Sequence, residues 1–333
     1  MDKIDILRDL VSFNTINDKD NKKIINYIEK YLKKYGFKTE YKTKCLVMSN
    51  KKNCEIGFLG HTDTVSYSNW KYNPFELVEK DNKLYGLGVC DMKGSIALIL
   101  SMIPKINKGI KLFFTYDEEI GFKGINELID NKISFPNKMI IGEPTCNEII
   151  NSSKGLLEFK LKFSGIFSHS SNPKEGENAI EKCVDFINEI KKYYKIIKKE
   201  LIIDKYATMN IGVINGGRSC NIVPDSCELL IDFRTINKSQ NKRIIKKINK
   251  LMNNKGSYEI INNINPFISE SKINMCDFIT EASFIDSKNK YILGLGPNNA
   301  HKKDEFIDID SLNFLEKQYI EIIGSDKNDN TKC

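Results

Sequence analysis

Histidine is scarce in this 333-residue chain, which contains only three. His61 begins the run His-Thr-Asp-Thr-Val, His169 ends the run Phe-Ser-His, and His301 begins the run His-Lys-Lys-Asp-Glu-Phe. Histidines used only for core packing would not all fall inside such polar motifs. We therefore interpret them as chemical groups, and the carboxylates around them point to metal-assisted chemistry.

The candidate metal ligands are two imidazoles and three carboxylates, a set that suits zinc or a similar divalent ion. Five ligands are one too few for two separate three-ligand sites, but they suffice if one carboxylate bridges two metals about 3.5–4 Å apart. A water shared by such metals loses a proton near neutral pH and attacks a carbonyl carbon. The predicted set is His61, Asp91, Glu119, Glu143 and His301.

Two acidic residues beside this set have predicted supporting roles. Asp63 is placed to accept the second ring N–H of His61. Glu118 and Glu119 are adjacent, so they point to different sides of an extended segment, and one can bind metal while the other acts as a general base. Taken alone, each motif also has an ordinary explanation: Asp91, for example, could merely cap the helix that follows it.

Short apolar runs precede most of these residues, and each run ends in a polar cluster. This pattern predicts buried strands of an open α/β sheet, with functional loops at the carboxyl ends of the strands. The expected strands cover residues 56–59, 112–116, 139–141 and 291–295, and helices are expected over 2–12, 20–35 and 92–103.

The middle of the chain follows a different pattern. Its strands and helices alternate in the order β-α-β-β-α-β, which is that of a ferredoxin-like unit. We therefore predict an α/β protein in which a mixed open sheet flanked by helices carries the metals, over residues 1–153 and 266–333, and a ferredoxin-like domain is inserted over 154–265. The inserted strands are expected at 155–164, 207–214, 227–233 and 258–264, and its helices at 175–194 and 241–252.

Composition narrows the possible partners and location. The net charge is +7, but isoleucines recur between the lysines of 191–199 and 242–250, as on amphipathic helices, so we expect no nucleic-acid partner. No run of roughly 18 apolar residues occurs, so no membrane span is expected. The early acidic residues do not fit a signal peptide, and nine dispersed cysteines are typical of a reducing cytoplasm.

The ordered motifs resemble a known di-zinc family of deacylases and exopeptidases, and the resemblance covers nearly the whole chain. It rests on residues 61–65, 85–94, 117–119, 142–145 and His301. It implies two divalent metals, zinc or cobalt, bridged by Asp91, with a cis peptide after Asp91. One metal would also bind His61 and Glu143, and the other Glu119 and His301. Glu118 would be the general base and the later proton donor.

The resemblance also implies a homodimer formed through the inserted domain, which the family uses as a lid. His169 would then reach across the dimer and donate to the developing oxyanion. Asn221 would lie near the substrate, and Arg234 would hold a substrate carboxylate. Without the family, a turn and a surface ion pair would explain the last two residues.

Local phrases, including Thr280–Ile285, are most similar to the acetylornithine deacetylases of this family. The implied reaction releases acetate from N-acetylornithine, a step of arginine biosynthesis, and Glu281 would pair with the cationic substrate. The alternative for Glu281 is a surface glutamate without a role. Other open substrates are N-succinyl-diaminopimelate, other N-acyl amino acids, dipeptides, and carrier-bound lysine or ornithine. A metal-binding regulatory protein without turnover is the non-enzyme alternative.

Overall fold

The computed structural model describes residues 1–269, 274–297 and 299–324 of the chain. It divides into two compact units, the first made of Met1–Asn151 and the chain from Thr280 onward, and the second of Ser152–Ile279. The second unit ends later than residue 265 because short strands after that point pair with its beginning. β15 (Phe267–Ile268) and β16 (Met275–Cys276) both pair with β8 (Ser152–Ser153).

The first unit is built on a mixed six-stranded sheet in the order β1-β2-β6-β3-β7-β17. β1 and β2 form an antiparallel hairpin whose second strand pairs antiparallel with β6, and the remaining neighbours are parallel. The predicted mixed sheet is thereby confirmed. Its strands are β1 (Lys38–Lys42), β2 (Leu46–Ser49), β3 (Ile56–His61), β6 (Ile110–Thr115), β7 (Lys138–Ile141) and β17 (Asn289–Ile292).

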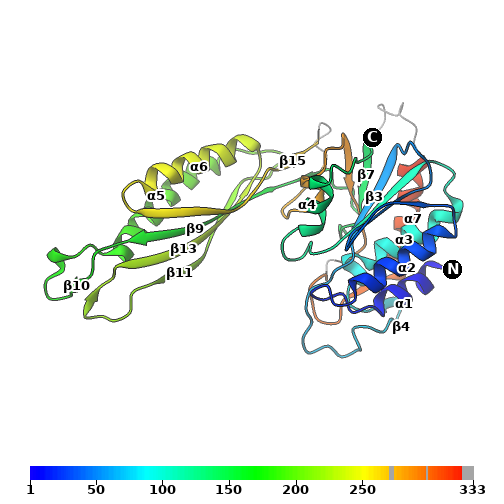
Figure 1. The fold of residues 1–333 in the computed structure, drawn as a ribbon, viewed down its shortest axis with the longest axis horizontal. Helices are drawn as coiled ribbons and strands as arrows, with labels where there is room; N and C mark the ends of the chain where they lie inside the picture. Colours follow the sequence, from blue (N-terminus) through cyan, green and yellow to red (C-terminus); the bar gives the residue numbers. More distant parts are fainter. Residues whose placement is uncertain (270–273, 298, 325–333) are drawn as a thin grey trace. The chain divides into compact units, whose positions relative to one another are not determined.

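Helices cover both faces of this sheet, because alternate strand residues are apolar on each side. Phe58 and Leu112 belong to one core cluster with the buried faces of four helices. Phe113 points the other way and stacks on Phe135, which follows α4. In Figure 1, α4 lies on the other side of the strands from α1, α2, α3 and α7. The helices are α1 (Lys3–Val11), α2 (Asn21–Lys33), α3 (Gly94–Met102), α4 (Lys123–Asp130) and α7 (Ile309–Gly324).

α3 is the central helix of the first unit, and it begins shortly after Asp91. Almost every residue of α3 is buried, and the helix contacts α1, α7 and β3. A small antiparallel sheet joins the segment before Asp91 to the segment before α7. In it β5 (Lys83–Tyr85) pairs with both β4 (Val78–Lys80) and β18 (Phe306–Asp308).

The second unit contains a four-stranded antiparallel sheet in the order β11-β13-β9-β14, covered by two helices whose apolar faces share one core cluster. Figure 1 shows α5 and α6 side by side over this sheet. The order along the chain is β-α-β-β-α-β, so the ferredoxin-like prediction is confirmed. The elements are β9 (Gly155–Ser164), α5 (Ala179–Ile197), β11 (Thr208–Gly216), β13 (Ser226–Thr235), α6 (Lys238–Met252) and β14 (Gly256–Ile264).

Two edges of the second unit bear on function. β11 is an edge strand, and its Val213 and Ile214 are 44% and 53% exposed. His169 lies in β10 (Ser168–His169), which pairs antiparallel with the distant strand β12 (Ile222–Val223). Among the described residues of both units, no helix combines the length and apolar character that crossing a membrane requires.

Replacing Leu98 of α3 with Ala should destabilise the first unit by about 3 kcal/mol, because it empties a fully buried site in the central helix. The measurement is the midpoint of urea unfolding. Ile320→Ala in α7, where the side chain is 52% exposed, is the control and should shift the midpoint little. Equal shifts for the two variants would contradict this assignment of the core.

Candidate metal centre

Parallel strands bring the predicted ligands to one edge of the sheet. His61 is the last residue of β3, Glu119 follows β6, and Glu143 follows β7. β3 lies between β6 and β7, so the loops at their carboxyl ends meet. Asp91 comes from the loop before α3, and His301 from the long connection after β17.

Asp91 lies between the two histidines. Its Oδ1 is 3.0 Å from Nε2 of His61, and its Oδ2 is 3.2 Å from Nε2 of His301. The same nitrogen of His301 is 2.9 Å from Oε1 of Glu119. Each oxygen of one carboxylate therefore faces a different histidine, which is the arrangement that a bridging ligand requires.

The described residues form two groups suited to metal binding, and Asp91 is common to both. One group is His61, Asp91 and Glu143, and the other is Asp91, Glu119 and His301. Within each group the candidate ligand atoms lie within 4.8 Å of one another. The five predicted ligands are thus brought together, and their arrangement fits two divalent ions.

The raised pKa values of the glutamates in and beside these groups indicate that added positive charge would stabilise their ionised forms. Burial, reinforced by Asp91, raises the pKa of Glu143 well above its ordinary value, and its Oε1 is buried without a hydrogen-bond partner. Burial and then Glu143 likewise raise the pKa of Glu118. Divalent cations would relieve both the burial cost and the repulsion.

The histidines hold protons tightly without metal. Hydrogen bonds to Asp91 and Glu119 raise the pKa of His301 to about 10. Burial acts to lower the pKa of His61, but hydrogen bonds to Asp63 and Asp91 raise it well above the ordinary value. In turn, burial acts to raise the pKa of Asp91, but hydrogen bonds from the two histidines outweigh it and hold that pKa low.

Asp63 lies against His61 with both its backbone carbonyl and its carboxylate. Nδ1 of His61 lies 3.1 Å from the backbone carbonyl oxygen of Asp63 and 3.5 Å from its carboxylate Oδ1. The nearer acceptor is therefore the carbonyl. The other carboxylate oxygen, Oδ2, accepts a hydrogen bond of 3.2 Å from the backbone N–H of Glu119. Asp63 thus connects the loops after β3 and β6.

Glu281 is buried, so the alternative that it is a surface glutamate without a role is wrong. Its side chain is 1% exposed, and its Oε2 accepts a hydrogen bond of 2.9 Å from the hydroxyl of Thr115 at the end of β6. Burial raises the pKa of Glu281 to about 7. A carboxyl group enclosed in this way presents no surface to a substrate, so direct pairing is not supported by this geometry.

Two buried residues that lie close to Asp91, namely Glu305 and Lys93, were not singled out from the sequence. The carboxylate of Glu305 accepts hydrogen bonds from the backbone N–H groups of residues 88, 90 and 91. Lys93 is fully buried and donates to the carbonyl oxygen of Phe13 at 2.9 Å, and burial lowers its pKa to about 7. Both residues stand inside motifs recognised from the sequence, but only the fold reveals their contacts. As the resemblance implied, the peptide bond between Asp91 and Met92 is cis.

The remaining predicted residues belong to the second unit. His169 is exposed, and its Nδ1 accepts a hydrogen bond of 3.2 Å from the backbone N–H of Ser171. A neutral imidazole therefore carries its proton on Nε2, where it can donate. Asn221 is exposed and accepts from the Ser219 hydroxyl. Arg234 lies 3.3 Å from Asp232, so in this structure it forms an intrachain ion pair.

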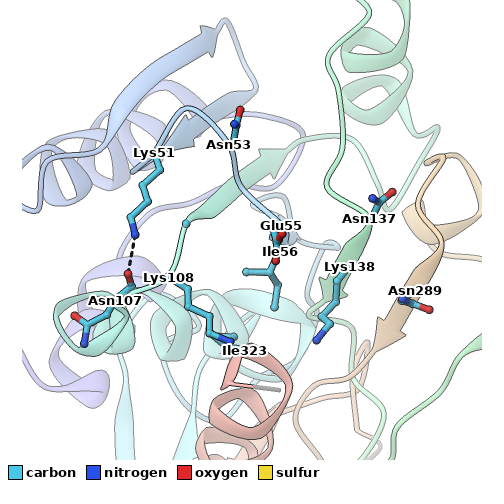
Figure 2. A pocket seen from close by; sticks show the side chains of 11 residues that line it. Lys51, Asn53, Glu55, Ile56, Asn107, Lys108, Asn137, Lys138, Asn289 and Ile323 are labelled. Carbon is cyan, nitrogen blue, oxygen red and sulfur yellow. Dashed lines mark hydrogen bonds between the residues drawn. The ribbon is translucent and has the colours of Figure 1, made fainter. Parts of the chain in front are cut away.

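Two cavities of similar size lie in the first unit. One, of about 520 Å³, adjoins the candidate metal centre and is lined partly by Asp63, Asp117 and Glu119. The other, of about 460 Å³, is shown in Figure 2. It is lined by Ile56 and Lys138, the first residues of β3 and β7, so it lies at the opposite edge of the sheet and contains none of the predicted ligands.

Comparison with known proteins agrees with this geometry. Residues 151–259 match the family described as the peptidase dimerisation domain of the M20 group. Acetylornithine deacetylase of Buchnera aphidicola subsp. Acyrthosiphon pisum (strain Tuc7) is 32% identical, over 92% of this chain and 93% of that protein.

Solved structures share the fold over nearly the whole chain. Aminopeptidase PepT of Bacillus cereus superposes with a TM-score of 0.79 at 18% identity, covering 96% of this chain and 97% of its own. The YXEP protein of Bacillus subtilis, described as a dinuclear metal-binding peptidase of the M20 family, has a TM-score of 0.71 at 12% identity and covers 96% of both chains. From its sequence relatives and its fold, the chain belongs to the M20 family and is a hydrolase that acts on amide bonds.

Proposed function

We propose that this protein is a dinuclear zinc deacylase that removes the acyl group from an N-acyl amino acid, with N-acetylornithine as its substrate. The single observation that carries the proposal is the position of Asp91, which turns one carboxylate oxygen toward each of two ligand groups. The Buchnera relative, named as an acetylornithine deacetylase, supports the substrate. Cobalt would substitute for zinc, since both suit mixed histidine and carboxylate ligands.

In this proposal the metals are held by His61, Asp91 and Glu143 on one side and by Asp91, Glu119 and His301 on the other. When bound, two zinc ions would polarise the scissile carbonyl and acidify the attacking water. Glu118 is the general base, because it belongs to neither ligand group and is adjacent in the chain to the ligand Glu119. It takes the proton of the water and passes it to the leaving amine nitrogen.

We propose that the second unit forms a homodimer and completes the substrate site. Edge strand β11, with Val213 and Ile214 exposed, supplies a surface that a symmetric partner would cover. His169 would donate its Nε2–H across the dimer to the oxyanion. Arg234 would exchange its partner Asp232 for a substrate carboxylate, and Asn221 would lie close by. The described cysteines are all free, which supports a cytoplasmic location.

The test of this function is amine release by the zinc-loaded protein from N-acetylornithine, N-succinyl-diaminopimelate and a neutral N-acetyl amino acid. We expect kcat/KM for N-acetylornithine to exceed the others at least tenfold. A preference for either other substrate would overturn the assigned substrate and keep the deacylase mechanism. No turnover of any of them by protein with two bound zinc ions would contradict the deacylase assignment and direct the search to dipeptides and carrier-bound lysine or ornithine.

Glu118→Gln should lower kcat by about 10²–10⁴-fold, because a neutral amide cannot accept the proton of the attacking water. The metal content, measured by atomic emission, should stay at two ions per subunit, since Glu118 is not a ligand in this proposal. Glu79→Gln, which changes an exposed glutamate of β4, is the matched control and should retain full activity. Loss of metal together with activity in the Glu118 variant would show that this side chain is a ligand instead.

Metal binding at pH 7 should release protons. The pKa of His301 is about 10 in the metal-free protein and that of His61 is raised, so both imidazoles are protonated there and must lose a proton to bind metal. The affinity for zinc should therefore rise as the pH increases from 6 to 8. Titration calorimetry in two buffers of different ionisation enthalpy measures the protons released. Heats that do not depend on the buffer would contradict this account of the ligands.

A further inference from the structure

We infer that Glu305 is a positioning residue for the reaction: its carboxylate fixes the loop that presents Asp91 to the two ligand groups. The inference rests on the proposed function, because it takes Asp91 as the bridging ligand. Glu305 itself is 2% exposed and is not a member of either ligand group.

Three backbone donors of one short segment converge on this carboxylate. Oε2 of Glu305 accepts from the N–H of Gly88 at 2.9 Å. Its Oε1 accepts from the N–H of Cys90 at 2.7 Å and from the N–H of Asp91 at 3.1 Å. All three hydrogen bonds act on the backbone that carries Asp91.

The segment needs such an acceptor because these N–H groups lie at the start of a short π-helical turn, η1 (Val89–Lys93), where they have no partner within the turn. Gly88 has a φ of +80°, and a Cβ at this position would lie 2.7 Å from the side chain of Thr64. The N–H groups of a buried loop with this path must find acceptors outside it, because leaving them unpaired costs free energy. Glu305 supplies the acceptors for three of them, so the path of the loop depends on it.

The same contact links both halves of the metal centre. Glu305 follows His301 closely in the chain, and its carbonyl oxygen accepts from the N–H of Gly86 at 3.1 Å. Directly after it, β18 pairs with β5. Hydrogen bonds at Glu305 therefore connect the segment that carries His301 to the segment that carries Asp91. A displacement of this contact would move Asp91 relative to both histidines.

A carboxylate is needed here because every one of its partners is a donor. A glutamine would keep one acceptor oxygen but would turn an NH₂ group toward a backbone N–H. Glu305→Gln therefore preserves the size of the side chain but places the NH₂ donor of the glutamine against a backbone N–H donor. Glu305→Asp keeps the charge, but its side chain is shorter and cannot reach all three N–H groups in the same geometry.

The experiment compares the full-length variants Glu305→Gln and Glu305→Asp with Asp304→Asn. Asp304 is a matched control, since its carboxylate accepts hydrogen bonds from a different segment, the backbone N–H groups of Lys71 at 2.7 Å and Tyr72 at 3.5 Å. Zinc affinity is measured by competition with a chromogenic chelator, the ligand geometry by the absorption spectrum of the cobalt form, and kcat and KM on the substrate that the wild type hydrolyses best. Thermal unfolding of the metal-free proteins monitors the fold.

We expect Glu305→Gln to lose about 10–100-fold in zinc affinity or in kcat, with KM within about twofold of wild type and an altered cobalt spectrum. Glu305→Asp should recover part of the loss, and Asp304→Asn should resemble the wild type. Wild-type zinc affinity, kcat and spectrum in Glu305→Gln would overturn the inference, as would an equal loss in Asp304→Asn. If Glu305→Gln does not fold, the comparison of Glu305→Asp with Asp304→Asn decides in the same way.

Failure of the proposed function has a different signature. A wild type that binds two zinc ions but hydrolyses no N-acyl amino acid would refute the proposed substrate class. The zinc affinities and cobalt spectra of the variants would still decide whether Glu305 positions Asp91.

Discussion

Negative charge crowded at one edge of the sheet is the constraint on which the rest of the first unit depends. Asp91, Glu118, Glu119 and Glu143 gather at one edge of the sheet, where burial and mutual repulsion raise the pKa of all but Asp91. Two histidines, one on each side of Asp91, offset part of this charge in the metal-free chain. Glu143, which has a buried oxygen without a hydrogen-bond partner, is the clearest sign that the offset is incomplete and that cations belong there.

The scaffold around the centre serves to hold these charges in place. Parallel strands deliver His61, Glu119 and Glu143 to one edge, and the buried helix α3 supports the loop of Asp91 from behind. Asp63 then joins two of the loops, through its carbonyl to His61 and through its carboxylate to the backbone of Glu119. Such supporting contacts matter because a catalytic metal pair demands ligand positions within a fraction of an ångström.

The proteins that this chain resembles include an acetylornithine deacetylase and an aminopeptidase, and both names denote hydrolysis of an amide bond. The candidate ligand set fits hydrolysis of an amide bond, but it says little about which acyl group or amine lies on either side of that bond. Substrate choice must therefore depend on the surrounding walls. Glu281 is an example. It lies in Thr280–Ile285, a segment that resembles the acetylornithine deacetylases, and yet its side chain is buried within the first unit.

The sequence by itself determined the candidate ligands, the strand-end position of most of them and the division into a sheet and a ferredoxin-like unit. It could do so because apolar runs followed by His, Asp or Glu leave few other folds, and because strand alternation in 155–164 is a local property. The remaining features required contacts between distant segments. Only the tertiary structure decided that the carbonyl of Asp63 is the nearer of its two acceptors to Nδ1 of His61, that Glu281 is buried, and that Glu305 lies against the backbone of residues 88–91. Such facts depend on which loops meet in space, and residue spacing along the chain carries no record of that.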